Sequence, residues 1–532
     1  MWDILIKAAR IIDGTGRSEF LGDIGIIHGM IADMGAHLDG EAREVIDCSR
    51  RFAASPGFVD VHAHSDFYIF RDSRLLPKLY QGVTTDISGN CGLSPAPVSE
   101  RYFDLICEYG KPLSSGIKMP DAWKDFTTFA KYRKAIENLR PGINVGYLAA
   151  QGTIRMCVMG FDGSKPSKAQ MSRMKGLLRE CLESGARGMS SGLVYMPGFF
   201  TSKEELIALC KVVKAHSGVY ATHMRNEGKG IVNALLETVD IARQSGCRAN
   251  ISHLKVIGKD NKPLVEKVLE IIHSARNEGI EICADQYPYQ AGCTFLNAIL
   301  PPPFLRQGLD HLCESLKDRG VRETIKDEIL ADRDPSWQNF VMACGFEGIR
   351  ICSAKNTKEH IGKTIAQLAD ERREDPFDTA FDLLETNEGD VLSIYTFVDE
   401  ESIVEIMTQP FTMVGTDGNL FDEKHNPHPR AHATFVRVLG KYVREGKRMP
   451  LETAIHKMTL LPAQCLGLSR KGQLAKGMDA DMVIFDPHTV EDGATFADTS
   501  IPNKGIAYVI VNGGIAVKDH QYIGDDRGRV LM

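Results

Sequence analysis

The amino-acid sequence predicts a mixed α/β fold, in which a (β/α)8 barrel is joined to a small β-sandwich domain built from both ends of the chain. Two observations carry this prediction. Through the middle of the chain, short apolar segments alternate with longer amphipathic ones, the order expected of parallel strands separated by helices. Both ends consist instead of short strand-like runs divided by turns, and we expect them to fold together.

Segments with the length and apolar content of barrel strands occur eight times in the middle of the chain. They are residues 57–64, 82–89, 143–150, 185–192, 218–224, 247–254, 280–287 and 411–417. Amphipathic segments separate them, and two of these, 168–185 and 202–218, end in Ser-Gly, which is typical of a helix end. The gap between Tyr287 and Phe411 is too long for one helix, so we expect an inserted subdomain or lid at about 290–350.

The small β domain is expected to comprise residues 1–56 and 469–532, and the barrel with its insertion residues 57–468. Near the C-terminal end, Asn512 and Gly513 stand between two β-rich runs, a strong signal for a two-residue hairpin turn. A chain of 532 residues is long enough for more than one hydrophobic core, as this division requires.

Composition argues against several classes of function. The formal net charge is -7, so no overall electrostatic attraction to nucleic acid or to anionic membranes is expected. The 13 cysteines are scattered without a C-x-x-C pair, which favours a reduced, cytoplasmic protein over a disulfide scaffold. The N-terminal run contains Asp3 and Lys7 and no long apolar core, so we expect no signal peptide. No apolar run approaches the ~20 residues that span a bilayer.

Side chains that bind metals stand at the ends of several predicted strands, and a barrel brings such ends together. They are His62 and His64 within the end of the first strand, Cys91 after the second, and His223, His253 and Asp417 at the ends of the fifth, sixth and eighth. Any one of them alone is more simply explained as a packing or turn residue. Together they predict a metal site, since two histidines two positions apart on a strand face the same side. Imidazole and thiolate favour zinc, with iron and manganese as alternatives.

Longer segments resemble a known family. In chain order they read "GFVDVHAHSD" (57–66), "SGNCGLSPAP" (88–97), "GARGMSSGLVYMPG" (185–198), "THMRNEG" (222–228), "SHLK" (252–255), "DQYPYQAG" (285–292), "GTDG" (415–418) and "NPHPRAHATFVRVLG" (426–440). This series resembles the amidohydrolase superfamily and, within it, the D-aminoacylase (N-acyl-D-amino-acid deacylase) group, nearly end to end. The resemblance implies a TIM-like barrel of the metal-dependent hydrolase type.

The resemblance also implies a division of the metal ligands. Many amidohydrolases bridge two metals with a modified lysine or a glutamate from the third or fourth strand, but segments 143–150 and 185–192 contain neither residue. The D-aminoacylase group uses a cysteine instead, and Cys91 is the matching position. The expectation is one tight zinc held by Cys91, His223 and His253, with His62 and His64 at a second, weaker position.

Substrate-binding residues follow from the same resemblance. Lys255, Tyr287 and Arg430 are expected to bind the α-carboxylate of an N-acyl-amino acid, because a guanidinium offers a carboxylate a bidentate fork. Tyr195 is expected near the oxyanion or the acyl group, with packing in the barrel as the simpler alternative. Histidines 425, 428 and 432 are expected to shape the loop that carries Arg430 rather than to form another metal site.

One position departs from the family pattern. After the third strand the chain reads "LAAQGTIR", where relatives tend to have Gly-His before a similar stretch, so Gln151 replaces a histidine. This replacement puts the acyl or side-chain pocket in question. The long segment between the seventh and eighth strands is the expected source of specificity.

The reaction expected from these parts is hydrolysis of the linear amide of an N-acyl-D-amino acid. Zinc lowers the pKa of a bound water toward ~7, and Asp417 is expected to take the proton of that water and pass it to the leaving nitrogen. Two alternatives remain on the sequence alone. One is a cyclic-amide hydrolase of the dihydroorotase or hydantoinase kind, and the other is a non-catalytic scaffold on the same fold.

Overall fold

The computed structural model describes residues 1–110, 121–420, 428–524 and 526–532. Each of the eight predicted barrel segments contains a parallel strand. Three strands form one sheet, in the order β6 (Phe58–Asp60), β7 (Val83–Ser88) and β8 (Asn144–Tyr147). Six form another, in the order β17 (Thr412–Val414), β13 (Ile282–Gln286), β12 (Arg248–Ile251), β11 (Val219–His223), β10 (Gly188–Gly192) and β9 (Ala149–Ala150).

The two parallel sheets continue into each other at both edges. Only Leu148 separates β8 from β9 along the chain. At the other edge, a parallel bridge joins Ala63, just after β6, to Gly418, just after β17. Every residue of β7, β8, β10 and β11 is buried, as expected of parallel strands covered on both faces. The carboxyl ends of these strands therefore meet at one end of the assembly.

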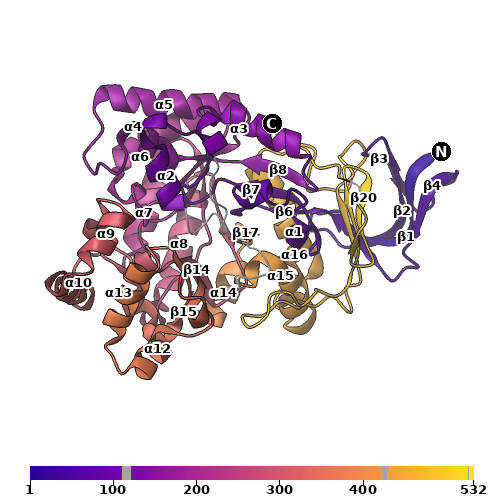
Figure 1. Ribbon diagram of the computed structural model, residues 1–532. Helices are drawn as coiled ribbons and strands as arrows, with labels where there is room; N and C mark the ends of the chain where they lie inside the picture. The colour runs from indigo at the N-terminus through magenta and orange to yellow at the C-terminus, as the bar shows by residue number, and fades with distance from the viewer. Residues whose placement is uncertain (111–120, 421–427, 525) are drawn as a thin grey trace.

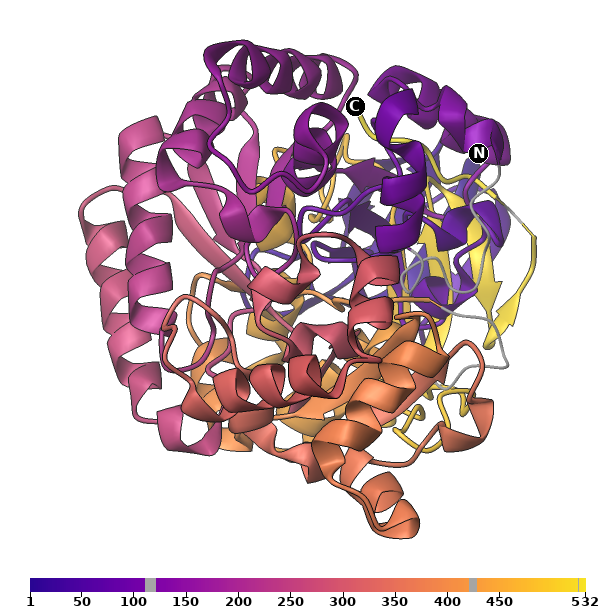
Figure 2. The same ribbon diagram turned by 60° about the vertical axis from the view of Figure 1, so that its left-hand side comes forward.

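Helices cover the outer side of the parallel strands, as Figure 2 shows. In chain order those between β8 and β13 are α4 (Gln151–Met159), α5 (Lys168–Glu183), α6 (Lys203–Ala215), α7 (Ile231–Ser245) and α8 (Leu264–Asn277). The predicted helices over 168–185 and 202–218 are confirmed. The Ser167 side chain and Gln170 form a capping box at the start of α5, and the Ser202 hydroxyl accepts from the Glu205 backbone N–H at the start of α6. These caps set where each helix begins after its strand.

Strands from both ends of the chain form one nine-stranded sheet, which lies to the right in Figure 1. The first part of the chain supplies β1 (Trp2–Ile11), β2 (Phe20–Ile27), β3 (Met30–Gly35), β4 (Ala42–Asp47) and β5 (Ala53–Pro56). The last part supplies β18 (Met482–Phe485), β19 (Ile506–Val511), β20 (Gly514–Lys518) and β21 (Gln521–Tyr522). The predicted hairpin joins β19 to β20, and Asn512 and Gly513 have φ of 46° and 75°, the left-handed pair that this turn requires.

A separate three-stranded antiparallel sheet lies between β13 and β17 in the sequence. It consists of β14 (Ala291–Phe295), β16 (Val391–Thr396) in the centre and β15 (Ile349–Ala354). Its helices are α9 (Leu309–Ser315), α10 (Arg319–Ala331), α11 (Phe340–Cys344), α12 (Ile365–Arg372) and α13 (Pro376–Thr386). In Figure 1 this group occupies the lower left, beside the parallel strands. It contributes β14, α11 and β16 to the wall of the cleft described below.

The chain after β16 completes the helical cover. Its helices are α14 (Glu400–Met407), α15 (Arg430–Arg437), α16 (Leu451–Met458) and α17 (Leu460–Cys465). Among the residues that the structure describes, we find no helix with the length and apolar character needed to cross a membrane.

Candidate metal centre and active site

The predicted metal-binding residues converge at the carboxyl ends of the parallel strands. His223 is the last residue of β11, while His253 lies just after β12, Cys91 after β7 and Asp417 after β17. The structure differs from the prediction for His62 and His64, which follow β6 rather than lying within it. Backbone hydrogen bonds hold that segment in place. The Asp417 N–H donates to the His62 carbonyl at 2.8 Å, and the His64 N–H donates to the Gly418 carbonyl at 3.2 Å.

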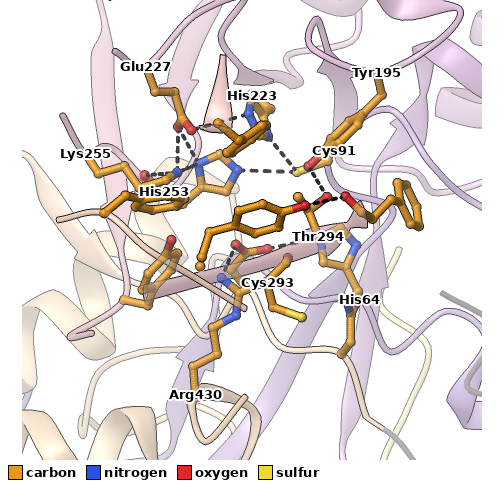
Figure 3. Close-up of a pocket in the computed structure, with 18 of the residues that line it drawn as sticks. His64, Cys91, Tyr195, His223, Glu227, His253, Lys255, Cys293, Thr294 and Arg430 are labelled. Carbon is orange, nitrogen blue, oxygen red and sulfur yellow. Dashed lines mark hydrogen bonds and ion pairs between the residues drawn. The ribbon is translucent and has the colours of Figure 1, made fainter. Parts of the chain in front are cut away.

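Cys91 lies at the centre of the cluster. Its Sγ is 3.4 Å from His62 Nε2, 3.6 Å from His253 Nε2 and 3.9 Å from His223 Nδ1. One donor atom each from His62, Cys91, His253 and Asp417 lie within 4.8 Å of one another, and all four residues are buried. Figure 3 shows His223, His253 and His64 on three sides of the cysteine. The donor set of nitrogen, sulfur and oxygen at this spacing fits a zinc-like ion.

His64 turns toward the carboxylate. Its Nε2 lies 3.2 Å from Asp417 Oδ1, and His62 Nε2 lies 3.4 Å from the same oxygen. The second Asp417 oxygen, Oδ2, lies 2.7 Å from Arg430 Nη1. Asp417 therefore stands between the two histidines of the first strand on one side and a guanidinium on the other.

The charge state of the cluster suits metal binding. Burial would raise the pKa of the Cys91 thiol, but the neighbouring His62, together with His223 and His253, lowers that pKa well below its ordinary value. Burial would also raise the pKa of Asp417, and the Arg430 guanidinium outweighs it, so the net pKa is well below the usual range. Both side chains are thus anionic at neutral pH, as ligands or bases must be.

Three residues of the cluster have left-handed backbone conformations. Cys91, His253 and Asp417 have φ of 52°, 38° and 47°. Residues other than glycine seldom adopt this region, and such strain of about 1–3 kcal/mol persists where the surrounding structure imposes it. Close packing imposes it at Cys91, since a Cβ on Gly192 would lie 2.1 Å from the Cys91 carbonyl oxygen. Each strained turn redirects a side chain from the strand end into the cluster.

A buried ion cluster supports this end of the strands. Lys78 contacts the Asp60 carboxylate, and its Nζ lies 3.3 Å from Asp86 Oδ2. Asp60 in turn accepts from the Thr416 backbone N–H at 2.9 Å and from the Thr416 hydroxyl at 2.7 Å. Because Thr416 precedes Asp417 and Asp60 stands two residues before His62, the cluster ties together the segments that carry both.

Two acidic residues at the site, Glu227 and Asp285, were not predicted from the sequence. Glu227 Oε1 lies 3.0 Å from His253 Nδ1 and 2.6 Å from Lys255 Nζ, while its Oε2 lies 3.4 Å from His223 Nε2. Asp285 Oδ1 lies 3.0 Å from His62 Nδ1. Both carboxylates lie in segments that the sequence analysis considered only for their histidine, lysine and tyrosine residues. The sequence signals that could have identified them are a glutamate four positions after His223 and an aspartate two positions before Tyr287.

The predicted substrate-binding residues line one cleft next to this cluster. The cleft encloses about 520 Å³, its open mouth included, and Lys255, Tyr287, Arg430 and Tyr195 all line it. The Arg430 guanidinium carbon lies 4.7 Å from the centre of the Tyr287 ring, and Lys255 Nζ lies 5.7 Å from it. The Tyr195 hydroxyl is 3.0 Å from Thr294 Oγ1, on β14. The two cations and Tyr287 thus share one region of the cleft.

Lys255 follows His253 by two positions, which on a continuing strand would place both side chains on one face, but β12 (Arg248–Ile251) ends before them. Lys255 lies beyond β12, where the left-handed turn at His253 ends any strand-like alternation, so a shared strand face does not explain its position. Its Nζ instead lies between Glu227 Oε1, His253 Nδ1 at 3.0 Å and the His253 carbonyl at 3.2 Å.

Aromatic and apolar side chains form much of the remaining cleft wall, which also includes the polar side chains of Thr294 and Asn419. The aromatic and apolar ones come mostly from residues 291–396; they are Leu93, Phe295, Phe340, Tyr395 and Phe397. A ligand with one anionic group and one apolar group would place the anionic group at the cationic region and the apolar group against the aromatic wall.

The remaining histidines and Gln151 stand apart from the metal ligands. His428 Nε2 donates to the Ala291 carbonyl at 2.7 Å, and its Nδ1 accepts from the Arg430 backbone N–H at 3.1 Å, so it holds the start of α15. His432 follows within α15, and position 425 lies outside the described residues. The buried Gln151 amide donates to Thr201 Oγ1 at 3.0 Å and is not among the residues lining the cleft.

The chain is similar to known proteins over nearly its whole length. Residues 44–517 match the model of the amidohydrolase family. A D-aminoacylase of Alcaligenes xylosoxydans xylosoxydans is 34% identical over 100% of this chain and 97% of its own length. An N-acyl-D-aspartate deacylase of the same organism is 33% identical over 99% of this chain and 95% of its own.

A solved structure is similar over the same extent. The N-acyl-D-glutamate deacylase from Bordetella bronchiseptica, solved with zinc and a phosphonate inhibitor that mimics the tetrahedral intermediate, superposes with a TM-score of 0.83. It is 32% identical and covers 100% of this chain and 99% of its own. The chain belongs to the amidohydrolase family, and its resemblance to the D-aminoacylase group is confirmed.

Proposed function

We propose that this protein is a zinc-dependent hydrolase that cleaves the linear amide of an N-acyl-D-amino acid into a carboxylate and a free D-amino acid. The observation that carries the proposal is that the Cys91 sulfur lies 3.9 Å from His223 and 3.6 Å from His253, with Asp417 close by, beside a cleft lined by two cations. Relatives named as deacylases of N-acyl-D-amino acids match essentially the whole chain, which supports the same reaction here.

The metal would be held by the cluster around Cys91. The proposed tight position uses Cys91, His223 and His253, and a second, weaker position would use His62 and His64. In His62 and His223 the ring nitrogen that points away from Cys91 faces a carboxylate, Asp285 for His62 Nδ1 and Glu227 for His223 Nε2. Carboxylates behind imidazoles are the usual arrangement around histidines that ligate a metal.

The chain's own residues would then carry out the proton transfers and the positioning. A zinc ion at this site would lower the pKa of a coordinated water and polarise the scissile carbonyl. Asp417, anionic and buried, takes the proton of the attacking water and delivers it to the leaving nitrogen. Tyr195, whose ring packs against His223, stands where its hydroxyl can donate to the carbonyl oxygen or contact the acyl group.

The α-carboxylate of the substrate would bind in the cationic region. Arg430 offers a planar fork, Lys255 an ammonium and Tyr287 a hydroxyl, which together fit one carboxylate. Burial would lower the pKa of Lys255, but Glu227 and Tyr287 outweigh it and the net pKa is raised, so the side chain stays charged.

The side chain of the substrate would be neutral and apolar. Of the lining residues that the structure describes, the lysine and the arginine are those assigned to the α-carboxylate, and the facing wall is aromatic. A second carboxylate would be buried there without a cation to pair with among the described lining residues, at a cost of several kcal/mol. We therefore propose N-acyl derivatives of apolar D-amino acids as substrates, in contrast to the acidic substrates named for the aspartate and glutamate relatives.

The proposed enzyme consists of three structural regions. We propose that the parallel strands and their helices form the (β/α)8 barrel over residues 57–468, that the terminal strands form a β-sandwich over 1–56 and 469–532, and that the insertion closes the cleft. The insertion proposed here covers 291–396, beyond the expected 290–350, because β16 is the central strand of its sheet.

Cyclic-amide hydrolysis is the weaker candidate. Segments 143–150 and 185–192 offer no lysine or glutamate to bridge two metals, and the Arg430 and Lys255 pair is suited to a free carboxylate. The deciding experiment measures zinc content and hydrolysis of N-acetyl-D- and N-acetyl-L-amino acids and of hydantoins. Turnover of hydantoins without N-acetyl-D-amino-acid turnover would refute the proposal, and so would a folded preparation that binds no zinc.

A further inference from the structure

We infer that Glu227 is a positioning residue of the proposed metal centre, one carboxylate that sets the orientation and tautomer of both His223 and His253. The inference rests on the metal centre of the proposed function. Glu227 follows β11 and is buried, with 1% of its surface exposed. Its two oxygens face different imidazoles, Oε1 toward His253 Nδ1 at 3.0 Å and Oε2 toward His223 Nε2 at 3.4 Å, as Figure 3 shows.

The two histidines present opposite ring nitrogens to Cys91. His223 turns Nδ1 toward the Cys91 sulfur at 3.9 Å, and His253 turns Nε2 toward it at 3.6 Å. In each ring the nitrogen that faces away from Cys91 is the one that faces Glu227. A neutral imidazole carries its proton on one nitrogen only, so a proton held at the Glu227 side leaves a lone pair on the Cys91 side. One anionic group thus selects Nε2–H at His223 and Nδ1–H at His253.

His223 has no competing partner for this nitrogen. Both His223 Nε2 and Glu227 Oε2 are buried without a hydrogen-bond partner among the described residues, and they lie 3.4 Å apart. Two unsatisfied polar atoms at that separation each offer what the other lacks. Glu227 Oε2 is therefore the acceptor available to a proton on His223 Nε2.

His253 has a competing neighbour, and this makes the inference testable. Lys255 Nζ also lies 3.0 Å from His253 Nδ1. An ammonium can only donate, so Lys255 alone would favour a bare Nδ1 and place the His253 proton on Nε2, facing Cys91. Glu227 prevents this because its Oε1 accepts from Lys255 at 2.6 Å and offers His253 Nδ1 an acceptor. The Lys255 ammonium is also satisfied by the His253 carbonyl at 3.2 Å.

The surrounding chain fixes Glu227 in this place. Its backbone N–H donates to Gln338 Oε1 at 2.7 Å, and its carbonyl accepts from the Ile257 N–H at 2.8 Å. The preceding residue, Asn226, donates to the Trp337 carbonyl at 2.9 Å. Residues 337 and 338 belong to the insertion, so this part of the insertion holds the carboxylate between the two imidazoles.

Glu227, His223 and His253 each offer one ligand atom within 4.8 Å of the others, so a direct role as a metal ligand is the alternative that the experiment must separate. Against it, Glu227 Oε1 already accepts from Lys255, and each Glu227 oxygen faces the imidazole nitrogen that points away from Cys91. A carboxylate behind a ligand histidine typically strengthens metal binding 10- to 100-fold without touching the metal.

The experiment measures zinc affinity of the full-length chain by competition with a fluorescent chelator, for wild type and the variants Glu227→Gln and Glu227→Gln/Lys255→Met. Glu227→Gln is expected to bind zinc about 10- to 100-fold more weakly. The double variant is expected to recover part of that loss, because removing Lys255 frees His253 Nδ1 to carry the proton. Cobalt-loaded wild type and Glu227→Gln at saturating metal should show the same thiolate charge-transfer and ligand-field bands.

A matched control is Glu205→Gln, which removes another buried carboxylate, one that faces Arg155 and Gln151 outside the site. Its zinc affinity should equal that of wild type. Zinc binding by Glu227→Gln within twofold of wild type would overturn the inference, and so would a double variant that recovers nothing or a cobalt spectrum showing one ligand fewer. A wild-type chain that binds no zinc would instead overturn the metal centre itself.

Discussion

Arg430 Nη1 lies 2.7 Å from Asp417 Oδ2, and both side chains are buried beside the candidate metal-binding residues. The same guanidinium donates through Nη2 to the Cys293 carbonyl at 3.2 Å and lies against the Tyr287 ring. Under the proposed function, a substrate carboxylate bound to Arg430 would lie beside the candidate base, Asp417. The pairing would then link recognition of the carboxylate to the position of the scissile bond.

Replacing Asp417 should separate catalysis from metal binding. Asp417→Asn is expected to lower kcat by about 10²- to 10⁴-fold, because it removes the proton acceptor. Zinc content should stay near that of wild type, since Cys91, His223 and His253 remain. Rates and zinc are measured on the same preparation. Wild-type turnover in the variant would contradict the assignment of Asp417 as the base.

Replacing Arg430 should affect carboxylate substrates selectively. Arg430→Met is expected to raise KM for N-acetyl-D-amino acids by at least about tenfold, because one charge-assisted contact to the carboxylate is lost. The matching substrates with an amide in place of the α-carboxylate should change little. Equal losses on the two series would show that Arg430 acts on Asp417 rather than on the substrate.

The aromatic wall predicts the preferred side chain. For wild type, kcat/KM for N-acetyl-D-leucine should exceed that for N-acetyl-D-aspartate by at least about 100-fold, since the second carboxylate would be buried unpaired. Phe397→Arg, which places a cation on the wall, should narrow this ratio. A wild type that prefers the aspartate substrate would contradict the proposed class.

The buried ion cluster beneath the site predicts a large stability effect. Lys78→Met leaves Asp60 and Asp86 buried without their shared cation, and breaking such an ion pair typically costs about 3–5 kcal/mol. The expected result is a clearly lower urea midpoint and melting temperature. Lys168→Met, at an exposed position at the start of α5, is the control and should change neither.

Lys457 predicts a pH-dependent contribution to stability. Burial lowers its pKa to about 8 in the folded protein, against the ordinary 10.5. Between those values the unfolded chain binds the proton and the folded chain does not, so the contribution of Lys457 to the free energy of unfolding rises with pH. Below about pH 8 both states are charged and this gain is absent.

The matched variant is Lys457→Met, compared with wild type by urea unfolding at pH 7 and pH 10. Its free energy of unfolding relative to wild type should fall as the pH rises, because only wild type gains stability across that window. A difference that stays constant over this range would contradict the lowered pKa.

Much of this protein could be predicted from local pattern. Each predicted parallel strand occurs, because a strand buried on both faces must be a short apolar run whatever surrounds it. The hairpin at Asn512 and Gly513 could be predicted because its turn requires two left-handed residues. The association of the two chain ends followed from their shared strand-like character.

The candidate site could likewise be predicted only in part from local pattern. The sequence by itself determined which residues could ligate a metal, since imidazole and thiolate at strand ends are chemically distinctive, and His62, Cys91, His253 and Asp417 do meet. Only the tertiary structure decided the role of Glu227, which depends on which oxygen faces which imidazole. It also decided that Arg430 pairs with Asp417 and that the insertion supplies an aromatic wall. Such contacts join segments that are distant in the chain. Their distances and angles depend on the tertiary packing and cannot be read from the local periodicity of the sequence.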